Sequence, residues 1–188
     1  MDIFKITPEE VNRILEMDED HFNDVKSKRI APAKLQETFV AFANADGGDI
    51  YIGIEDKKSE GERLQGFQAP EEANPIIATL LEETKPSVEN TLVEFLRTEA
   101  GGLILHFGIP KSPKVHYTAA GDCFIRVNAS KVKIKGDRVT QLGYSKGAEP
   151  YEKKAVEDVE LEEMAGSTVL AKYMTRVASE LEPSVFLK

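Results

Sequence analysis

Residues 39–56 read FVAFANADGGDIYIGIED, and this stretch contains the end of a helix, a turn and a strand. Leu35, Phe39 and Phe42 are spaced three or four residues apart, so they share one face of a predicted helix. Proline at position 32 suits the first turn of that helix. The paired glycines permit a tight turn at its end. The run IYIGI that follows is rich in β-branched residues and predicts a buried strand.

Further helices and strands are predicted on both sides of this stretch. Thr7 and Glu10 form a capping box at the start of a helix over residues 8–16. Further helices are predicted over residues 71–84 and over most of 159–181, where Gly166 divides the helix. Strands are predicted over residues 21–28, 91–98, 103–110 and 123–127. The alternation predicts an α/β fold with some α+β character, in which helices flank a mixed sheet.

Composition places the chain among cytoplasmic globular proteins. Its 188 residues are 41% hydrophobic, which is enough for a sizeable core. Cys123 is the single cysteine, so an internal disulfide is excluded and a reducing compartment is expected. The sequence has no apolar run of about 18 residues and no N-terminal signal pattern. We therefore expect a cytoplasmic location and no membrane partner.

Charge is distributed unevenly along the chain. The net charge of −9 argues against a protein that simply coats DNA. Residues 103–148 nevertheless carry eight Lys and Arg against two Asp and Glu, whereas residues 149–163 carry seven acids and two lysines. We expect one domain over residues 1–148, in which a basic face is possible, and an acidic, helical extension over residues 149–188. The apolar end, PSVFLK, suggests that the natural protein continues beyond Lys188.

Two groups of carboxylates are candidates for a catalytic site. In the first, Glu19 precedes a predicted strand on which Asp24 and Lys26 point to the same face. In the second, Glu55 and Asp56 follow the buried strand of the IYIGI run. If the two strands are neighbours, Glu19, Asp24 and Asp56 can converge on one magnesium or manganese ion, which prefers oxygen ligands. The alternative is that these are ordinary solvated charges at strand ends.

The basic segment offers candidates for phosphate contacts. Lys131, Lys133 and Lys135 alternate, so one face of an extended segment can follow a phosphate backbone. The alternative is an edge strand whose lysines prevent aggregation. The full set of candidate nucleic-acid-binding residues is Lys111, Lys114, Arg126, Lys131, Lys133 and Lys135.

Other chemistry has little support in the sequence. His106 lies in an apolar run, which favours a packed core histidine, whereas His116 lies in a more polar loop. Neither histidine has a Cys or His partner at the spacing of a zinc site. Cys123 precedes apolar residues and is expected to be buried rather than nucleophilic. The phosphate-binding pattern of P-loop proteins is absent, so no P-loop nucleotide site is expected.

Three motifs together resemble the Schlafen AlbA-like domain family. Residues 39–56 resemble the family's "AFAN-x-x-GG" turn and the strand that follows it. Upstream, Glu19 and the DVK of residues 24–26 resemble its "E-x4-E-F-K" segment. Downstream, residues 121–127, GDCFIRV, resemble its "G-x-x-[YF]-[IV]-R-[VI]" strand. The motifs occur in the family's order and span about residues 19–130.

This resemblance implies a compact nucleic-acid-binding domain and names candidate site residues. Animal members of the family include endoribonucleases that cleave tRNA and rRNA with three carboxylates and a divalent metal. The matching positions are Glu19, Asp24 and Asp56, with Lys26 at the family's lysine. Arg126 matches the strand arginine, which either contacts phosphate or braces the fold.

The chain also departs from the family pattern. Aspartate at position 24 replaces glutamate, Val25 replaces phenylalanine, and the zinc ligands of the animal proteins have no counterpart. Those proteins hold two lobes in one chain, so a single lobe here suggests a homodimer.

Three functions therefore stay open. The first is a metal-dependent endoribonuclease that acts on structured RNA such as tRNA. The second is a non-catalytic DNA- or RNA-binding regulatory module of a longer protein. The third is a protein-interaction domain that uses the acidic segment 149–163.

Overall fold

The computed structural model describes residues 1–99, 102–147, 164–177 and 180–186. The chain divides into two compact units, Met1–Glu149 and Pro150–Lys188. In the second unit the described elements are α6 (Thr168–Val177) and α7 (Pro183–Phe186), which pack together. Part of the helix predicted over residues 159–181 and the whole acidic segment 149–163 lie outside the described residues.

The first unit is built on a mixed five-stranded sheet. Its strands are β1 (Asp2–Lys5), β2 (Asn23–Lys26), β3 (Gly48–Ile52), β4 (Leu92–Arg97) and β5 (Leu103–Ile109), in the order β1-β4-β5-β3-β2. The central pairs β3–β5 and β4–β5 are antiparallel, whereas the outer pairs β1–β4 and β2–β3 are parallel. Strands β1 and β2 are therefore the two opposite edges of the sheet. The expected α/β fold with a mixed sheet is confirmed.

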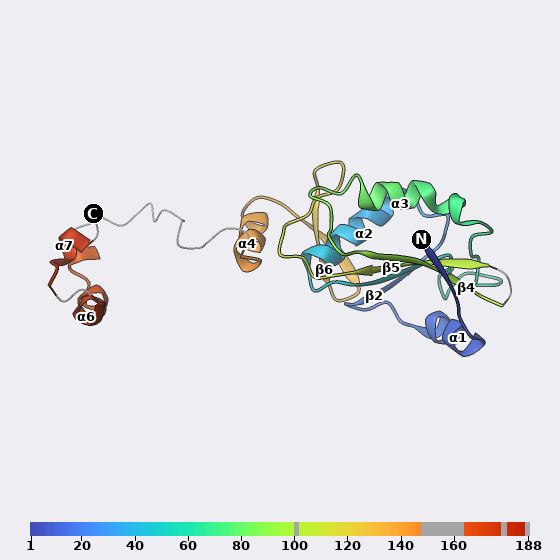
Figure 1. Ribbon diagram of the computed structural model, residues 1–188, viewed down its shortest axis with the longest axis horizontal. Coiled ribbons are helices and arrows are strands. Elements are labelled where there is room, and N and C mark those ends of the chain that lie inside the picture. Colours follow the sequence, from blue (N-terminus) through green and yellow to red (C-terminus); the bar gives the residue numbers. More distant parts are fainter. Residues whose placement is uncertain (100–101, 148–163, 178–179, 187–188) are drawn as a thin grey trace. The chain divides into compact units, whose positions relative to one another are not determined.

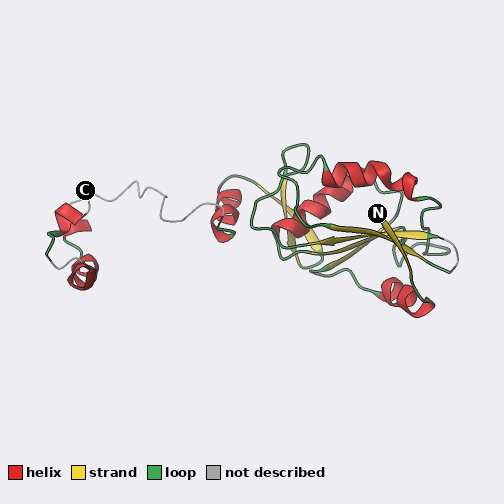
Figure 2. Ribbon diagram, in the orientation of Figure 1, coloured by secondary structure: helices red, strands yellow, loops and turns green. Residues whose placement is uncertain are grey.

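Helices cover both faces of this sheet. On one face lie α2 (Pro32–Asn44) and α3 (Asn74–Leu81), and on the other lies α1 (Pro8–Glu16), as Figure 1 shows. Coloured by secondary structure, the same view shows the strands as the middle layer (Figure 2). The predicted capping box of α1 is present, because the Thr7 hydroxyl accepts from the backbone N–H of Glu10 and the Glu10 carboxylate accepts from that of Thr7.

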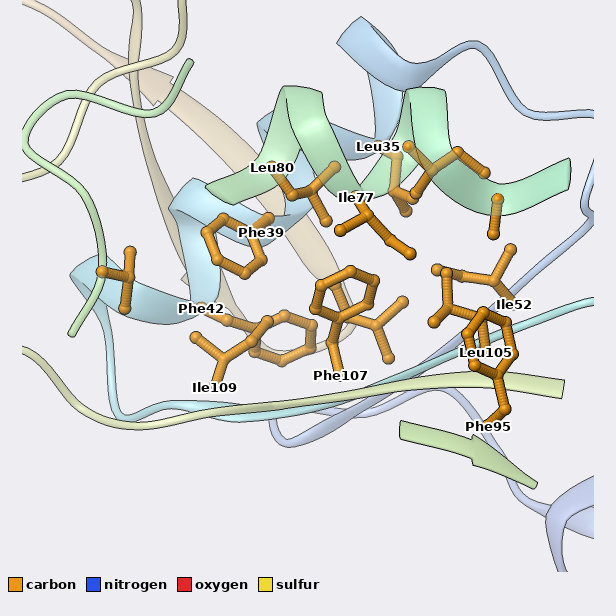
Figure 3. Packing of buried hydrophobic residues seen from close by; sticks show 14 of the residues in the cluster. Leu35, Phe39, Phe42, Ile52, Ile77, Leu80, Phe95, Leu105, Phe107 and Ile109 are labelled. Carbon is orange, nitrogen blue, oxygen red and sulfur yellow. The ribbon is translucent and has the colours of Figure 1, made fainter. Parts of the chain in front are cut away.

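The main core fills the space between the sheet and helices α2 and α3 (Figure 3). The rings of Phe39 on α2 and Phe107 on β5 meet edge to face at 6.0 Å. Both rings are fully buried, as are Phe42 and Leu35 on the predicted apolar face of α2. A smaller cluster on the opposite face joins Ile14 of α1 to the sheet. The periodicity of residues 32–44 thus predicts the helical face that the sheet covers.

A two-stranded ribbon packs against α2 from outside the main sheet. It consists of β6 (Cys123–Val127) and β7 (Ser130–Ile134), which pair antiparallel. Phe124 on β6 packs with Val40 and Ala41 of α2. The ribbon is followed by α4 (Asp137–Ser145). The strand at residues 123–127 and the strands that correspond to β4 and β5 were predicted from sequence.

Some predicted boundaries differ from the structure. Strand β2 covers residues 23–26 rather than 21–28, because Asp20 folds the preceding residues into a turn by accepting from the N–H groups of Phe22 and Asn23. The helix predicted over residues 71–84 begins at Asn74, after the short 3₁₀ helix η1 (Pro70–Ala73). Strand β1 and helix α4 were not predicted.

Candidate functional site

Asp24 lies on β2 with its side chain 2% exposed, and two cations hold its carboxylate. The Arg126 guanidinium on β6 contacts Oδ2 at 2.8 Å. The ammonium of Lys26, two residues along β2, contacts Oδ1. The same ammonium donates to Oε1 of Glu19 at 2.6 Å. Each oxygen of the buried carboxylate therefore has a cationic partner, and Lys26 links it to the second carboxylate.

Arg126 connects the ribbon to the turn before β2. Its side chain is 2% exposed, and its Nε and Nη2 donate to the carbonyl oxygen of Asp20 at 3.1 and 2.8 Å. The guanidinium also lies 4.6 Å from the centre of the Phe42 ring. All of these contacts are internal to the chain. Of the two roles expected for Arg126, bracing the fold agrees with its burial, and direct contact with phosphate does not.

Asp56 follows β3 on an exposed loop, where Oδ1 accepts from the backbone N–H of Lys58. It lines a cavity of about 210 Å³ together with Glu19. Three cationic side chains also line this cavity, namely Lys57, Lys58 and Arg63, and so does Asp18. The structure therefore brings Glu19 and Asp24 together through Lys26, and Glu19 and Asp56 together around the cavity. It does not gather all three carboxylates at one point.

This arrangement does not fit a magnesium or manganese ion. A divalent ion needs several oxygen ligands that face a common centre. The Lys26 ammonium lies at the oxygens of Glu19 and Asp24, and Arg126 contacts the remaining oxygen of Asp24. Within the described part of the chain, no three His, Cys, Asp or Glu side chains are grouped so that they could hold a metal ion.

The electrostatics of the cluster follow from its partial burial. Burial raises the pKa of Glu19, and the neighbouring Asp24 carboxylate raises it further, against the opposing effect of Lys26. Burial acts to lower the pKa of Lys26, but Asp24 and Glu19 outweigh it, so this pKa lies above its ordinary value. Lys26 is thus held as an ammonium ion, and Glu19 gains a proton more readily than an ordinary glutamate does.

The lysines predicted to contact phosphate lie on the surface, and four of the five are in ion pairs. These pairs are Lys111 with Asp46 at 2.9 Å, Lys114 with Glu89 at 2.6 Å, Lys131 with Glu37 at 2.9 Å and Lys133 with Asp122 at 2.5 Å. Lys135 is exposed just beyond β7. The predicted alternation is present, but it turns Lys131 toward α2, where its ammonium also donates to the carbonyl of Lys34.

Lys57, Lys58 and Arg63 were missed as candidate site residues. The available signal was the KK pair directly after Asp56, which adds positive charge at the end of β3. Lys57 contacts Asp18, and Arg63 donates to the main-chain carbonyls of Leu15 and Glu55. The exposed ammonium of Lys58 has no ion-pair partner among the described residues. It is therefore available to an anionic ligand.

The histidines and the cysteine have internal partners. His106 on β5 is buried, as predicted, between the carboxylates of Glu94 and Asp49, 2.9 and 2.8 Å away. His116 is fully buried, with Nδ1 2.7 Å from the carbonyl oxygen of Pro86 and Nε2 2.6 Å from a serine hydroxyl; burial lowers its pKa. Cys123 is buried as predicted, and burial raises the pKa of its thiol to about 11, so it is a poor nucleophile.

Comparisons with known proteins agree with this fold. A family model described as "Schlafen, AlbA_2" matches residues 19–135, which contain all three sequence motifs. The crystal structure of the DIP2311 protein from Corynebacterium diphtheriae is similar at 18% identity with a TM-score of 0.51, over 93% of this chain. The matched region is 39% of that protein's chain, so this chain spans well under half of its length. No curated protein matches. None of the described helices is both long enough and apolar enough to cross a membrane.

Proposed function

Because this chain belongs to the Schlafen, AlbA_2 family, we propose that it is a nucleic-acid-binding domain that holds its ligand without cleaving it. Family membership supports a role connected with nucleic acid. The observation that carries the non-catalytic part of the proposal is that both carboxylate oxygens of Asp24 are in ion pairs, one with Lys26 and one with Arg126. A carboxylate that is buried and paired with two cations has a structural role inside the fold and is not free to bind a metal ion.

Exposed cations are the proposed contacts with the phosphate backbone. Lys58 lies at the 210 Å³ cavity, and Lys135 lies beyond the ribbon. Lys111 and Lys114 are 66% and 52% exposed, so their surface ion pairs can exchange a carboxylate for a phosphate at small cost. Each lysine that contacts a phosphate releases counterions, which makes the affinity fall as salt rises.

A titration of fluorescently labelled RNA and DNA oligonucleotides tests binding. We expect a dissociation constant that rises steeply between 50 and 200 mM salt. Neutralising Lys58 and Lys135 together, as Lys58→Met with Lys135→Met, weakens binding to all sequences alike and lowers the slope of log Kd against log salt by about two. Lys85→Met serves as a matched control at another exposed lysine. Affinity that does not respond to salt contradicts the proposal.

A metal-dependent endoribonuclease is the second candidate function. The observation that favours it is that Glu19 and Asp56, two of the three family positions, line one cavity beside Lys57 and Arg63. Cleavage of structured RNA that depends on manganese and disappears in Asp56→Ala would establish this function in place of the first. Intact RNA under the same conditions rejects it.

A further inference from the structure

An exposed aromatic ring stands beside the candidate site, on the turn that leads into β2. The Phe22 side chain is 51% exposed, although phenylalanine is among the residues most often buried. Its sequence neighbours Asp20, His21 and Asn23 are polar. A single ring bordered by polar groups differs from the contiguous apolar patch that usually marks a protein–protein interface.

The main chain of Phe22 is fixed on both sides. Its N–H donates to Oδ1 of Asp20 at 2.7 Å, and its carbonyl oxygen accepts from the N–H of Asp49 at 2.7 Å. Gly48 permits this close approach, because a Cβ there would lie 2.4 Å from the Phe22 carbonyl oxygen. Arg126 holds the same turn through the Asp20 carbonyl. The ring is therefore presented by a rigid backbone, so little backbone order has to be gained when a ligand contacts it.

His21 and Asp46 link the Phe22 ring to a lysine. The His21 and Phe22 rings are nearly perpendicular, with centroids 4.8 Å apart and planes at 87°. His21 Nε2 lies 3.0 Å from Oδ2 of Asp46, and the Lys111 ammonium donates to Oδ1 of the same carboxylate at 2.9 Å. The imidazole thus packs against the Phe22 ring, and a largely exposed lysine belongs to the same network.

We propose that Phe22 is a stacking platform for an unpaired base of single-stranded nucleic acid, with the adjoining phosphate at Lys111; this rests on the proposed function. A base has a flat apolar face and a polar edge, which matches a rigid ring among polar side chains. Stacking on an aromatic side chain beside basic residues is a general way of holding single strands with little sequence preference. A base inside a duplex is already stacked and cannot use the platform.

Phe22→Trp provides a direct probe, because the chain contains no tryptophan. The introduced indole is then the only one in the protein, and stacking with a base quenches its fluorescence. We expect a single-stranded oligonucleotide of about twelve nucleotides to quench it with the same Kd that anisotropy gives for binding. Phe4→Trp is the matched control, because Phe4 is 49% exposed and lies on β1, at the opposite edge of the sheet from β2. Its fluorescence stays unchanged on binding.

Phe22→Ala measures what the platform contributes. We expect the Kd for the single strand to rise about ten-fold, while the Kd for a duplex of the same sequence and the melting temperature stay the same. Phe4→Ala leaves both constants unchanged.

Two results would overturn the inference, and they differ in what they say of the proposed function. If wild-type protein binds single strands and Phe22→Ala binds them equally well, the platform is rejected and nucleic-acid binding stands. If wild-type protein binds no oligonucleotide at low salt, the platform and the proposed function both fail.

Discussion

At the scale of single residues, the central feature is the buried Asp24 carboxylate between Lys26 and Arg126. The sequence predicted that Asp24 and Lys26 share a face of a strand, and the structure places them in contact. It could not predict the partnership with Arg126, which lies 102 residues further along the chain. Arg126 pairs with the carboxylate oxygen of Asp24 that Lys26 does not contact. Residues expected in a catalytic site and a residue expected to contact phosphate therefore form one internal cluster.

Asp24→Ala is expected to destabilise the fold strongly. It leaves the buried guanidinium of Arg126 without its carboxylate, and breaking a buried ion pair from one side costs about 3–5 kcal/mol. The free energy of unfolding, measured in urea, checks this value. Asp56→Ala is the control, because Asp56 is exposed and its loss is expected to change stability by less than about 0.5 kcal/mol. Equal stabilities for the two variants would contradict an internal role for Asp24.

The raised pKa of His106 predicts that the stability of the fold depends on pH. Burial acts to lower its pKa, but Asp49 and Glu94, which face its two ring nitrogens, outweigh burial and raise it above 6.5. Tyr51, which is also titratable, stacks on the imidazole. Since the folded pKa is raised, the stabilisation is complete below pH 6.5 and is lost as pH rises through the folded value.

Melting temperatures measured from pH 6 to pH 9 test this prediction. We expect the wild-type value to fall as pH rises over this range and the fall to be smaller in His106→Gln. A decline of the same size in both proteins would assign the effect to other groups.

At the scale of secondary-structure elements, α2, the glycine turn and β3 form a continuous unit that contributes many of the residues of the main core. It was predicted correctly because its signals are local: helical spacing, two glycines and a β-branched run. Strand β1 was missed because a four-residue segment with all of its side chains exposed has no clear pattern, and only its parallel pairing with β4 defines it. Helix α4 was missed for a similar reason, since none of its residues is buried.

Two alanine substitutions, one in this turn and one in the loop after β3, separate steric contact from backbone strain. Gly47 has φ +81°, and a Cβ there would lie 2.5 Å from the Ile109 carbonyl oxygen and 2.8 Å from the Lys111 nitrogen. Gly61 has φ +93° with open space around it. Both changes introduce strain of about 1 kcal/mol from positive φ, but only Gly47→Ala also forces β5 and the turn apart. We expect Gly47→Ala to lower the free energy of unfolding by at least about 1 kcal/mol more than Gly61→Ala. Similar losses would show that the turn tolerates a side chain.

At the scale of the whole molecule, the domain combines an acidic overall charge with local groups of cations. The linear sequence indicated positive charge over residues 103–148, but folding pairs four of the lysines there with carboxylates, three of which come from other segments of the chain. It also adds Lys57, Lys58 and Arg63 around Glu19 and Asp56. Such groupings depend on tertiary contacts, so the sequence predicted the family but not how these charged side chains are arranged.

Homodimerisation stays a prediction at this scale. A binding groove made from two lobes requires two copies of a single-lobe chain. Analytical ultracentrifugation is expected to give twice the 20.8 kDa mass of one chain. A mass of one chain at all concentrations would show that a single lobe acts alone.

The most direct test of binding without cleavage is one incubation of labelled tRNA with the pure protein, in manganese or in chelator, divided between a native and a denaturing gel. A domain that binds without cleaving gives a shifted band on the native gel and full-length RNA on the denaturing gel, with and without manganese. Manganese-dependent fragments that are absent with Asp56→Ala would contradict it and identify an endoribonuclease. The absence of any shift at low salt would contradict nucleic-acid binding itself.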